Sequence, residues 1–229
     1  MSQRPPLNHH QRVLALQLFD LGAVKIAGPN EPGWPLRRHR EHPDEPPSLI
    51  YFDLRTKDNP KPGPLTEEVL RSIGWQLQCL SRDLEYDLVI PIPNAGDPLA
   101  RAFVEAAPFR MKLQRRPAVG MQKQNGRIVG MRAEDIPARL ALPIDDVISG
   151  ADSMLEGITK IRDQDLVVKD CLALIDREQG GETLLRNAGV EPHVVYKATD
   201  VLQLYVDHKR VDWPTANRVL EYIAANQFT

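Results

Sequence analysis

Two adjacent carboxylates, Asp145 and Asp146, stand between an apolar stretch and a turn of small and hydroxyl-bearing residues. The turn comprises Ser149, Gly150, Ala151, Asp152 and Ser153, and a helical pattern follows it. The start of a helix presents backbone N–H groups to an anion, and the helix dipole favours a phosphate there. Carboxylates just before such a turn can accept hydrogen bonds from vicinal sugar hydroxyls or lie near a hydrated Mg²⁺. The pattern therefore suits a ribose 5-phosphate, and the alternative interpretation is that the two acids cap a helix in a solvated loop.

Two more turns come directly after apolar runs that are typical of buried strands. The first contains Asn94, Ala95 and Gly96, and the second is Asp-Arg-Glu-Gln-Gly-Gly at residues 176–181. In an open sheet of parallel strands, ligands bind beyond the carboxyl ends of the strands. We therefore expect these two turns and residues 145–153 to lie along one edge of a sheet.

The order of the expected elements indicates an α/β protein with a mostly parallel, twisted sheet flanked by helices. Helical periodicity and capping residues predict helices at 10–24, 65–83, 98–107, 152–163, 180–189 and 212–227. Apolar runs predict strands at 48–55, 86–93, 109–116, 139–144, 170–177 and 191–199. Residues 117–130 form a polar segment with three glycines, which is expected to be flexible. We expect a small N-terminal hood over residues 1–60, with a helix, a Pro- and Arg-rich insert at 28–47 and a strand, and an α/β core over 61–229.

The composition is that of an ordinary globular protein and argues against several classes of function. The 229 residues are 42% hydrophobic and 26% charged, and the formal net charge of −2 does not suit a nucleic-acid-binding surface. Cys79 and Cys171 are the only cysteines, which predicts reduced thiols rather than a disulfide scaffold. The first residues lack the apolar run of a signal peptide, and no stretch has transmembrane length. We therefore expect a cytoplasmic protein that binds neither membranes nor nucleic acid.

The acid pair and the turn after it resemble the phosphoribosyl-pyrophosphate (PRPP) binding motif of type I phosphoribosyltransferases. Asp-Arg-Glu-Gln-Gly-Gly after a strand is similar to the orotate phosphoribosyltransferases, and it is much more specific than the acid pair. Residues 48–55 and 217–228 also look like that family, so the resemblance covers about residues 12–228.

The resemblance implies a reaction in which a ring nitrogen of orotate displaces pyrophosphate from PRPP, with Mg²⁺, to give orotidine 5′-monophosphate. It implies that Asp145 and Asp146 hold the ribose hydroxyls and that the turn at 149–153 holds the 5′-phosphate. It further implies that Arg177 faces orotate and that Asn94, Ala95 and Gly96 lie beside the pyrophosphate. Lys25 matches an early lysine of the family that contacts substrate. An ordinary strand-to-helix turn is nearly as good an interpretation of residues 94–96. A solvated side chain is nearly as good an interpretation of Lys25. No metal ligand is placed.

The resemblance also implies a homodimer, because the family supplies a mobile loop with one Arg, two Lys and one His across the dimer. Residues 116–123 match that loop and keep Arg116, but Pro117 and Gly120 stand at the lysine positions and Gln122 at the histidine position. Lys123, Arg127 and Lys112 are candidates to replace the missing cations, so the candidate catalytic residues are Asp145, Asp146, Arg116 and Lys123. Such cations would stabilise the departing pyrophosphate.

Two alternative functions follow from these departures. One is a PRPP- or nucleotide-binding homologue that has little transferase activity and plays a regulatory role. The other is a transferase for a different base, which the altered insert at 28–47 permits; Arg37 and Arg38 of that insert are candidate base contacts. In the turn after the acid pair, Ala151 replaces the usual glycine and Asp152 adds a negative charge next to the anion site.

Overall fold

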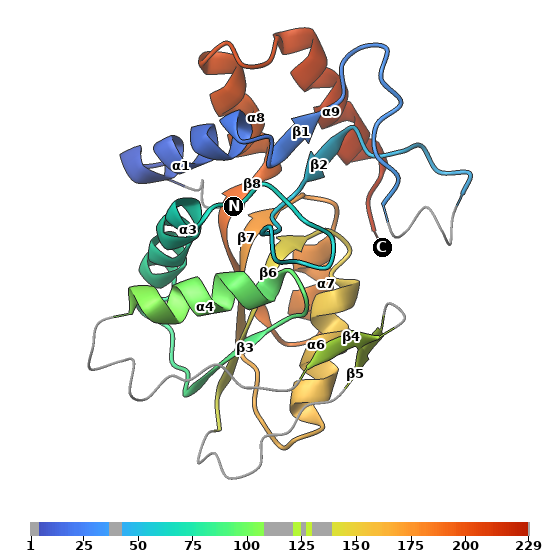
Figure 1. The fold of residues 1–229 in the computed structure, drawn as a ribbon. Coiled ribbons are helices and arrows are strands. Elements are labelled where there is room, and N and C mark those ends of the chain that lie inside the picture. The colour runs from blue at the N-terminus through green and yellow to red at the C-terminus, as the bar shows by residue number, and fades with distance from the viewer. Residues whose placement is uncertain (1–4, 37–42, 108–120, 125–126, 130–138, 229) are drawn as a thin grey trace.

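A computed structural model of the chain describes residues 5–36, 43–107, 121–124, 127–129 and 139–228 (Figure 1). Its centre is a parallel sheet of four strands in the order β3-β6-β7-β8. These strands are β3 (Leu88–Pro91), β6 (Ala141–Ile148), β7 (Asp170–Asp176) and β8 (Glu191–Lys197). They read as apolar runs because both faces of the sheet are covered. The predicted α/β class, a parallel sheet flanked by helices, is confirmed.

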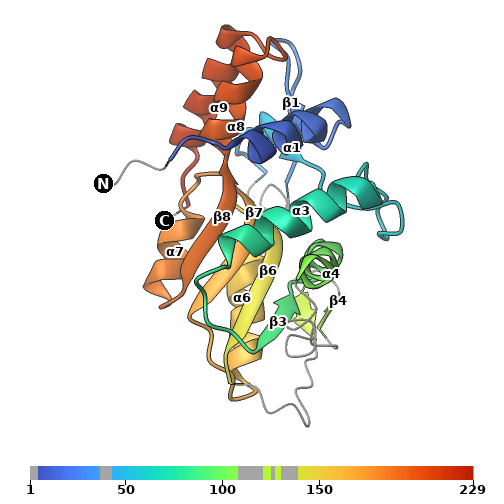
Figure 2. The same cartoon turned by 90° about the vertical axis from the view of Figure 1, so that its left-hand side faces the viewer.

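Helices cover the two faces of this sheet (Figure 2). One face carries α3 (Glu67–Leu80) and α4 (Gly96–Ala106), and the other carries α6 (Asp152–Arg162) and α7 (Gly181–Asn187). Side chains alternate along each strand, so that Leu172 and Leu174 pack with α3 and α4 while Cys171 and Ala173 pack with α6 and α7. The two cores hold the strands from both sides and fix where their carboxyl ends lie.

A second group of elements lies over the carboxyl ends of the strands, at the upper end of Figure 1. It contains α1 (His9–Asp20), β1 (Val24–Ile26), β2 (Ile50–Phe52), α8 (Ala198–Asp207) and α9 (Trp213–Ala225), with β1 and β2 paired antiparallel. The two ends of the chain meet here, because the Tyr205 hydroxyl donates to the Ala15 carbonyl at 2.8 Å and Arg210 pairs with Asp20 at 2.9 Å. The division of the chain at residue 60 stays a prediction.

Strand β6 is longer than the sequence predicts. It continues through Asp145 and Asp146 to Ile148, so the acids belong to the strand and not to the turn. The parallel ladder with β7 continues past them, with Asp145 opposite Ala173. The run of apolar residues ends before residue 145, but the backbone hydrogen bonds between the strands continue. These hydrogen bonds, rather than apolar character, define the extent of the strand.

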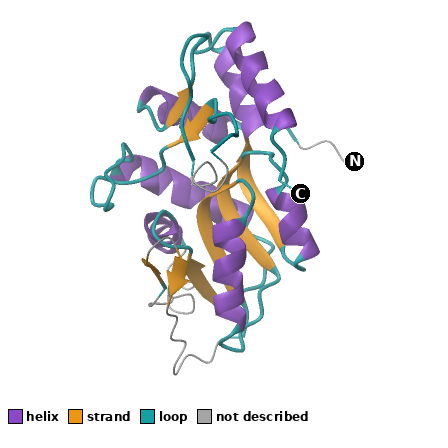
Figure 3. Cartoon of the chain, turned by 90° about the vertical axis from the view of Figure 1, so that its right-hand side faces the viewer, coloured by secondary structure: helices purple, strands orange, loops and turns teal. Residues whose placement is uncertain are grey.

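The structure differs from the predicted secondary structure in three further places. Residues 122–124 and 127–129, expected to be flexible, form an antiparallel pair, β4 (Gln122–Gln124) and β5 (Arg127–Val129). This pair lies beside α6, apart from the main sheet (Figure 3), where Glu156 accepts the Ile128 N–H at 2.8 Å. Helix α8 is absent from the predicted elements. The helix predicted at 10–24 ends earlier, at Asp20, because Gly22 has a positive φ of 71° and β1 follows. The predicted strand at 109–116 lies outside the described residues.

No helix in these parts of the chain is both long and apolar enough to cross a lipid bilayer.

Helices α3 and α4 approach closely where Gly74 of α3 packs against Ala102 of α4. A Cβ added at Gly74 would lie 2.3 Å from the Ala102 carbonyl oxygen.

We predict that Gly74→Ala lowers the free energy of unfolding by about 1–3 kcal/mol, because overpacking outweighs the better helix propensity of alanine. Urea unfolding measures this difference. Arg71→Ala, at an exposed position of the same helix, is the control and should change stability by less than about 0.5 kcal/mol. Equal stability of Gly74→Ala and the wild type would contradict the close approach.

Candidate functional site

A pocket with a cavity volume of about 400 Å³ lies at the carboxyl edge of the sheet. Its lining comes from the three predicted turns and from β2: Asn94 and Ala95 after β3, Asp145, Asp146 and residues 149–154 from β6 and its turn, Arg177 after β7, and Tyr51 and Phe52. Gly96 is adjacent, at the first position of α4, where a Cβ would lie 2.4 Å from the Ile144 carbonyl oxygen. The parallel sheet thus brings the three turns to one edge, as the sequence predicts.

Asp145 and Asp146 occupy the last part of β6 and both line the pocket. Asp145 is only 6% exposed, and its Oδ1 accepts the Asp146 N–H at 2.9 Å. The Oδ1 of Asp146 accepts the Val147 N–H at 2.8 Å in the same way. Each carboxylate is therefore oriented by the main chain of the next residue. This arrangement differs from acids that cap a helix in a solvated loop, because α6 begins only at Asp152.

The turn after β6 leads into α6 without a side-chain cap. Ala151 is the N-cap residue, with a left-handed φ of 61°, and its methyl side chain makes no cap hydrogen bond. The N-cap position of α6 thus lacks the side-chain acceptor that Ser, Thr, Asp or Asn supplies at many helix starts. The turn is held from one side by Gly181, where a Cβ would lie 2.3 Å from the Ser149 carbonyl oxygen. An anion in the pocket would meet a helix start that is rigidly placed and uncapped.

Arg177 is buried in the wall of the pocket with 4% exposure. One terminal nitrogen of its guanidinium donates to the Ser48 hydroxyl and, at 3.1 Å, to the Ile50 carbonyl. Its Nε has no hydrogen-bond partner among the described residues. Burial lowers the pKa of Arg177 to about 10, so the group keeps its charge at neutral pH. Arg177 forms no surface ion pair among the described residues, since its side chain is buried and joins β7 to β2.

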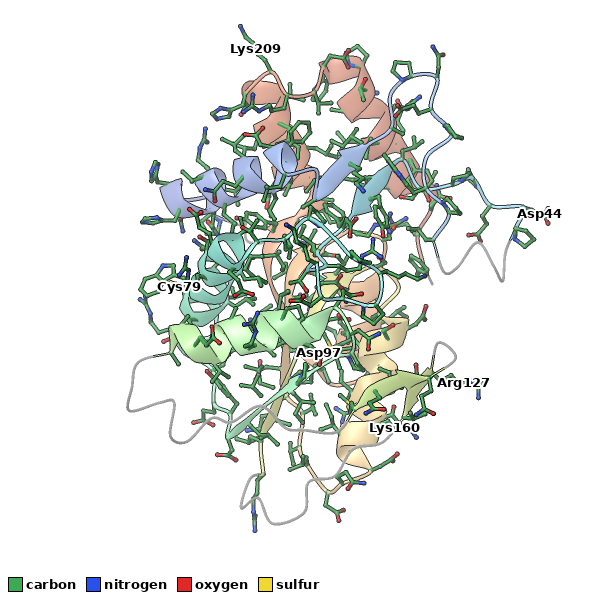
Figure 4. All side chains as sticks on the ribbon, in the orientation of Figure 1. Asp44, Cys79, Asp97, Arg127, Lys160 and Lys209 are labelled. Atoms are coloured by element: carbon green, nitrogen blue, oxygen red, sulfur yellow. The ribbon has the colours of Figure 1, made fainter. Side chains whose placement is uncertain are left out.

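Apart from Arg177, none of the predicted cations whose side chains the structure describes lines this pocket. Lys25 lies in β1, with its Nζ 3.3 Å from Asp53 Oδ2 and 5.7 Å from the ring centroid of the pocket residue Tyr51. Arg127 is exposed on β5 and points outward, as does Lys160 of α6 on the same side of the molecule (Figure 4). The main chain of Lys123 lies in β4, while its side chain is outside the described part of the structure. Arg116, Lys112, Arg37 and Arg38 also lie outside the described residues.

Sequence reasoning missed seven residues that line the pocket: Leu36, Tyr51, Phe52, Pro93, Val147, Met154 and Phe228. Tyr51 and Phe52 belong to a strand that was predicted, and a pair of aromatic residues in it is a signal that could have found them. Burial raises the pKa of Tyr51, and Asp53 and Asp146 add to this shift while Arg55 opposes it. Phe228 has no local signal, because only the fold brings it to the pocket.

Comparison with known proteins places these features in a family context. No family model matches the chain. Over 184 residues the chain is 28% identical to uridine 5′-monophosphate synthase of Bos taurus, a match that covers 79% of this chain but 36% of the bovine protein. The chain thus corresponds to about a third of that relative. It is 26% identical to orotate phosphoribosyltransferase of Pyrobaculum aerophilum over 210 residues, which cover 91% of this chain and 96% of that protein.

The fold is also similar to solved structures. The UMP synthase of Leishmania donovani superposes with a TM-score of 0.71 at 19% identity and covers 94% of this chain, which corresponds to 42% of that protein. The orotate phosphoribosyltransferase of Francisella tularensis has a TM-score of 0.66 at 16% identity and covers 99% of this chain. At these identities the structural likeness establishes the fold.

Asp176, the last residue of β7, generates a prediction about pH. It is 2% exposed, its Oδ1 accepts the Glu178 N–H at 2.8 Å, and its Oδ2 lies 3.7 Å from Lys197 Nζ. Burial raises the pKa of Asp176 to about 6 from an ordinary value of 3.8. The folded protein therefore binds this proton more tightly than the unfolded chain, and the resulting stability is lost as the pH rises through about 6.

We predict that the stability of the wild type relative to Asp176→Asn falls by on the order of 2 kcal/mol between pH 4 and pH 7. Urea unfolding of both proteins at several pH values measures this difference. Asp212→Asn is the control with the opposite sign, because hydrogen bonds from Thr215 lower the pKa of Asp212. The stability of the wild type relative to that variant should fall as the pH decreases. A difference between wild type and Asp176→Asn that does not change with pH would contradict the buried proton.

Proposed function

Because this chain belongs to the orotate phosphoribosyltransferase family, we propose that it transfers the 5-phosphoribosyl group of PRPP to orotate. The products are orotidine 5′-monophosphate and pyrophosphate. The observation that carries the proposal is that one pocket holds Asp145 and Asp146, the uncapped start of α6 and Arg177. The two carboxylates suit sugar hydroxyls, the start of α6 suits a phosphate, and Arg177 suits the polar edge of a base.

The acid pair suits the ribose for two reasons. Carboxylate oxygens accept hydrogen bonds from the two vicinal hydroxyls, and charge-assisted hydrogen bonds of this kind are strong. The transition state carries positive charge on the ribose ring as the bond to pyrophosphate breaks, and fixed negative groups near that ring stabilise it. Since Asp145 and Asp146 are oriented by backbone N–H groups, they need little rearrangement when the charge develops.

The base would lie between Arg177 and the aromatic residues of β2. Arg177 Nε is a buried donor without a partner among the described residues, and such a donor is costly to leave unpaired. A carbonyl or carboxylate oxygen of orotate would supply the acceptor. Tyr51 and Phe52 line the same pocket and offer a flat apolar surface to a planar ring. Tyr51 is itself supported by Trp34, whose ring stacks on it at a centroid distance of 6.1 Å.

We propose Mg²⁺ as the cofactor, bound together with the phosphates of PRPP. Among the described residues, no three metal-ligating side chains form a cluster, so these parts of the chain offer no all-protein cage. The carboxylates of Asp145 and Asp146 fit an ion that keeps several waters and takes its other ligands from substrate phosphates, which is the usual mode for Mg²⁺. Bound there, the ion would neutralise negative charge on the leaving pyrophosphate.

We also propose that the chain acts in the cytoplasm as a homodimer, with Arg116 and Lys123 on a loop that serves the partner's pocket. The state of the two cysteines supports this compartment: Cys79 is exposed, as Figure 4 shows on α3, and Cys171 is buried, and both are free thiols. Burial raises the pKa of the Cys171 thiol, which keeps it protonated and unreactive.

A second candidate function is binding of PRPP or a nucleotide without turnover, in a regulatory role. The observation that favours it is the charge of the pocket, where the described lining carries Asp145, Asp146 and Asp152 but a single cation, Arg177. Pro117 and Gly120 stand where the family has lysines. A transferase for a base other than orotate is the third possibility.

The deciding experiment is an assay with PRPP, Mg²⁺ and orotate beside a calorimetric titration of PRPP. We predict formation of orotidine 5′-monophosphate and a loss of about tenfold in PRPP affinity on Asp146→Asn, since the hydroxyl contact loses its charge. Asp163→Asn, at the distal end of α6, is the matched control and should bind as the wild type does. If the protein binds PRPP but forms no product with orotate or with any other base, the second candidate function, binding without turnover, is established. Unchanged binding by Asp146→Asn would show that the acids are structural.

Substitution of Asp152 is expected to change PRPP affinity in the direction opposite to substitution of Asp146. It is exposed in the first turn of α6 and lines the pocket, so its carboxylate stabilises the helix start but repels a phosphate bound there. We predict that Asp152→Asn raises the affinity for PRPP by about three- to tenfold at low salt, because one unfavourable charge pair is removed. The same change should lower the free energy of unfolding by about 0.3–1 kcal/mol. Titration at two salt concentrations tests the first part, and weaker binding by Asp152→Asn would show that the carboxylate contributes a favourable contact.

A further inference from the structure

The segment that follows α9 returns to the pocket. Residues 226–228 run from the end of α9 toward the carboxyl edge of the sheet (Figure 1). Phe228 lines the pocket together with Ser149 and Gly150. This segment is far from the site in sequence.

Hydrogen bonds fasten the segment to the turn after β7. The Phe228 N–H donates to the Gln179 carbonyl at 2.7 Å, and the Gln179 side-chain amide donates to the Asn226 carbonyl at 2.9 Å. The Gln227 side-chain amide donates to the Glu178 carbonyl at 2.9 Å. Gln179 is 2% exposed, so its bond to Asn226 is shielded from water. The segment is thus attached to the same turn that carries Arg177.

Two glycines make room for Phe228. A Cβ added at Gly150 would lie 2.4 Å from Cδ1 of the Phe228 ring. A Cβ added at Gly180, whose φ is 100°, would lie 2.3 Å from the Phe228 carbonyl oxygen. The ring therefore rests on the main chain of one turn, while the backbone of the same residue rests on the other. Phe228 occupies the space between the anion-binding turn, residues 149–153, and the turn at 177–180.

We propose that Phe228 is a positioning residue for ligand binding, which holds the anion-binding turn at a fixed distance from the turn that carries Arg177. Its ring shields one side of the pocket from water, and hydrogen bonds to an anion are stronger where water is excluded. The identity of the ligand, a 5-phosphoribosyl group, rests on the proposed function. The placement of the turns by Phe228 rests on contacts that are present without any ligand.

The first test is a double-mutant cycle between residues 150 and 228. Gly150→Ala alone should lower the affinity for PRPP with Mg²⁺ by more than about tenfold, because the new methyl group collides with the ring and moves the turn. Phe228→Ala alone should lower it by about five- to tenfold. In the background of Phe228→Ala, Gly150→Ala should cost less than about twofold, since the collision is gone. Fully additive losses would overturn the proposal.

The second test needs no ligand and separates this inference from the proposed function. Hydrogen exchange of the free protein should accelerate by about tenfold or more at residues 150–153 and 178–181 in Phe228→Ala, with little change in α6 beyond its first turn. Phe228→Leu, which keeps most of the apolar volume, should restore much of the protection, and it is the variant to use if Phe228→Ala does not fold. Trp213→Ala, at a position of α9 that is 53% exposed, is the control and should leave both turns unchanged.

The outcomes are distinguishable. If the wild type binds no PRPP, the proposed function fails while hydrogen exchange still decides the role of Phe228. Unchanged exchange at both turns in a folded Phe228→Ala protein would overturn the positioning role even if the wild type is an active transferase.

Discussion

The site depends on the parallel register between β6 and β7. Ile148 stands opposite Asp176, and one residue later the Arg177 N–H donates to the Ile148 carbonyl at 2.8 Å. This register places the acid pair, the anion-binding turn and Arg177 around one cavity. A shift of one residue would turn every side chain of the strand to the opposite face and separate these groups. Gly181 makes the same register possible at the turns, because no side chain could fit against the Ser149 carbonyl.

Two arginines hold the elements above the sheet: the buried Arg177 ties them to this edge, and the half-buried Arg218 ties them to one another. Arg177 reaches Ser48 and Ile50 and thereby fixes β2, whose Tyr51 and Phe52 close the pocket. Arg218 of α9 donates to the carbonyl oxygens of Ala27, Gly28 and Pro29, which follow β1. A guanidinium has several donors in a fixed plane, so one side chain can join two or three backbone groups from remote segments. The wall of the pocket is consequently built by both ends of the chain, and residues far from it in sequence contribute to its shape.

The sequence predicts the sheet and its carboxyl edge well, because these depend on local signals. Apolar runs, capping residues such as Thr66 and glycines after strands are legible in short windows, and parallel strands place their following turns together by geometry alone. The length of β6 was underestimated because periodicity reports burial, whereas the ladder continues through two acids whose oxygens bind the adjacent main chain. Helix α8 was missed: the strand predicted at 191–199 includes its first two residues, because no Gly or Pro separates Lys197 from Ala198, and residues 200–207 received no prediction. The contacts of Arg177 and Phe228 were out of reach, because they join segments that only the tertiary fold brings together.

The distribution of charge in the pocket separates recognition of the sugar phosphate from transfer. Ribose hydroxyls and a single phosphate are matched by carboxylates and by the uncapped start of α6, and neither requires a mobile cation. In the proposed transfer, departure of pyrophosphate would place several negative charges beside Asp145 and Asp146, and Arg177 is the single cation in the described lining that could offset them. The proposed divalent ion and the basic residues Arg116 and Lys123 would add to this stabilisation. Recognition and transfer would then rest on different residues of the same chain, so that substitutions in the segment 116–123 would abolish turnover while the pocket continues to bind its ligand.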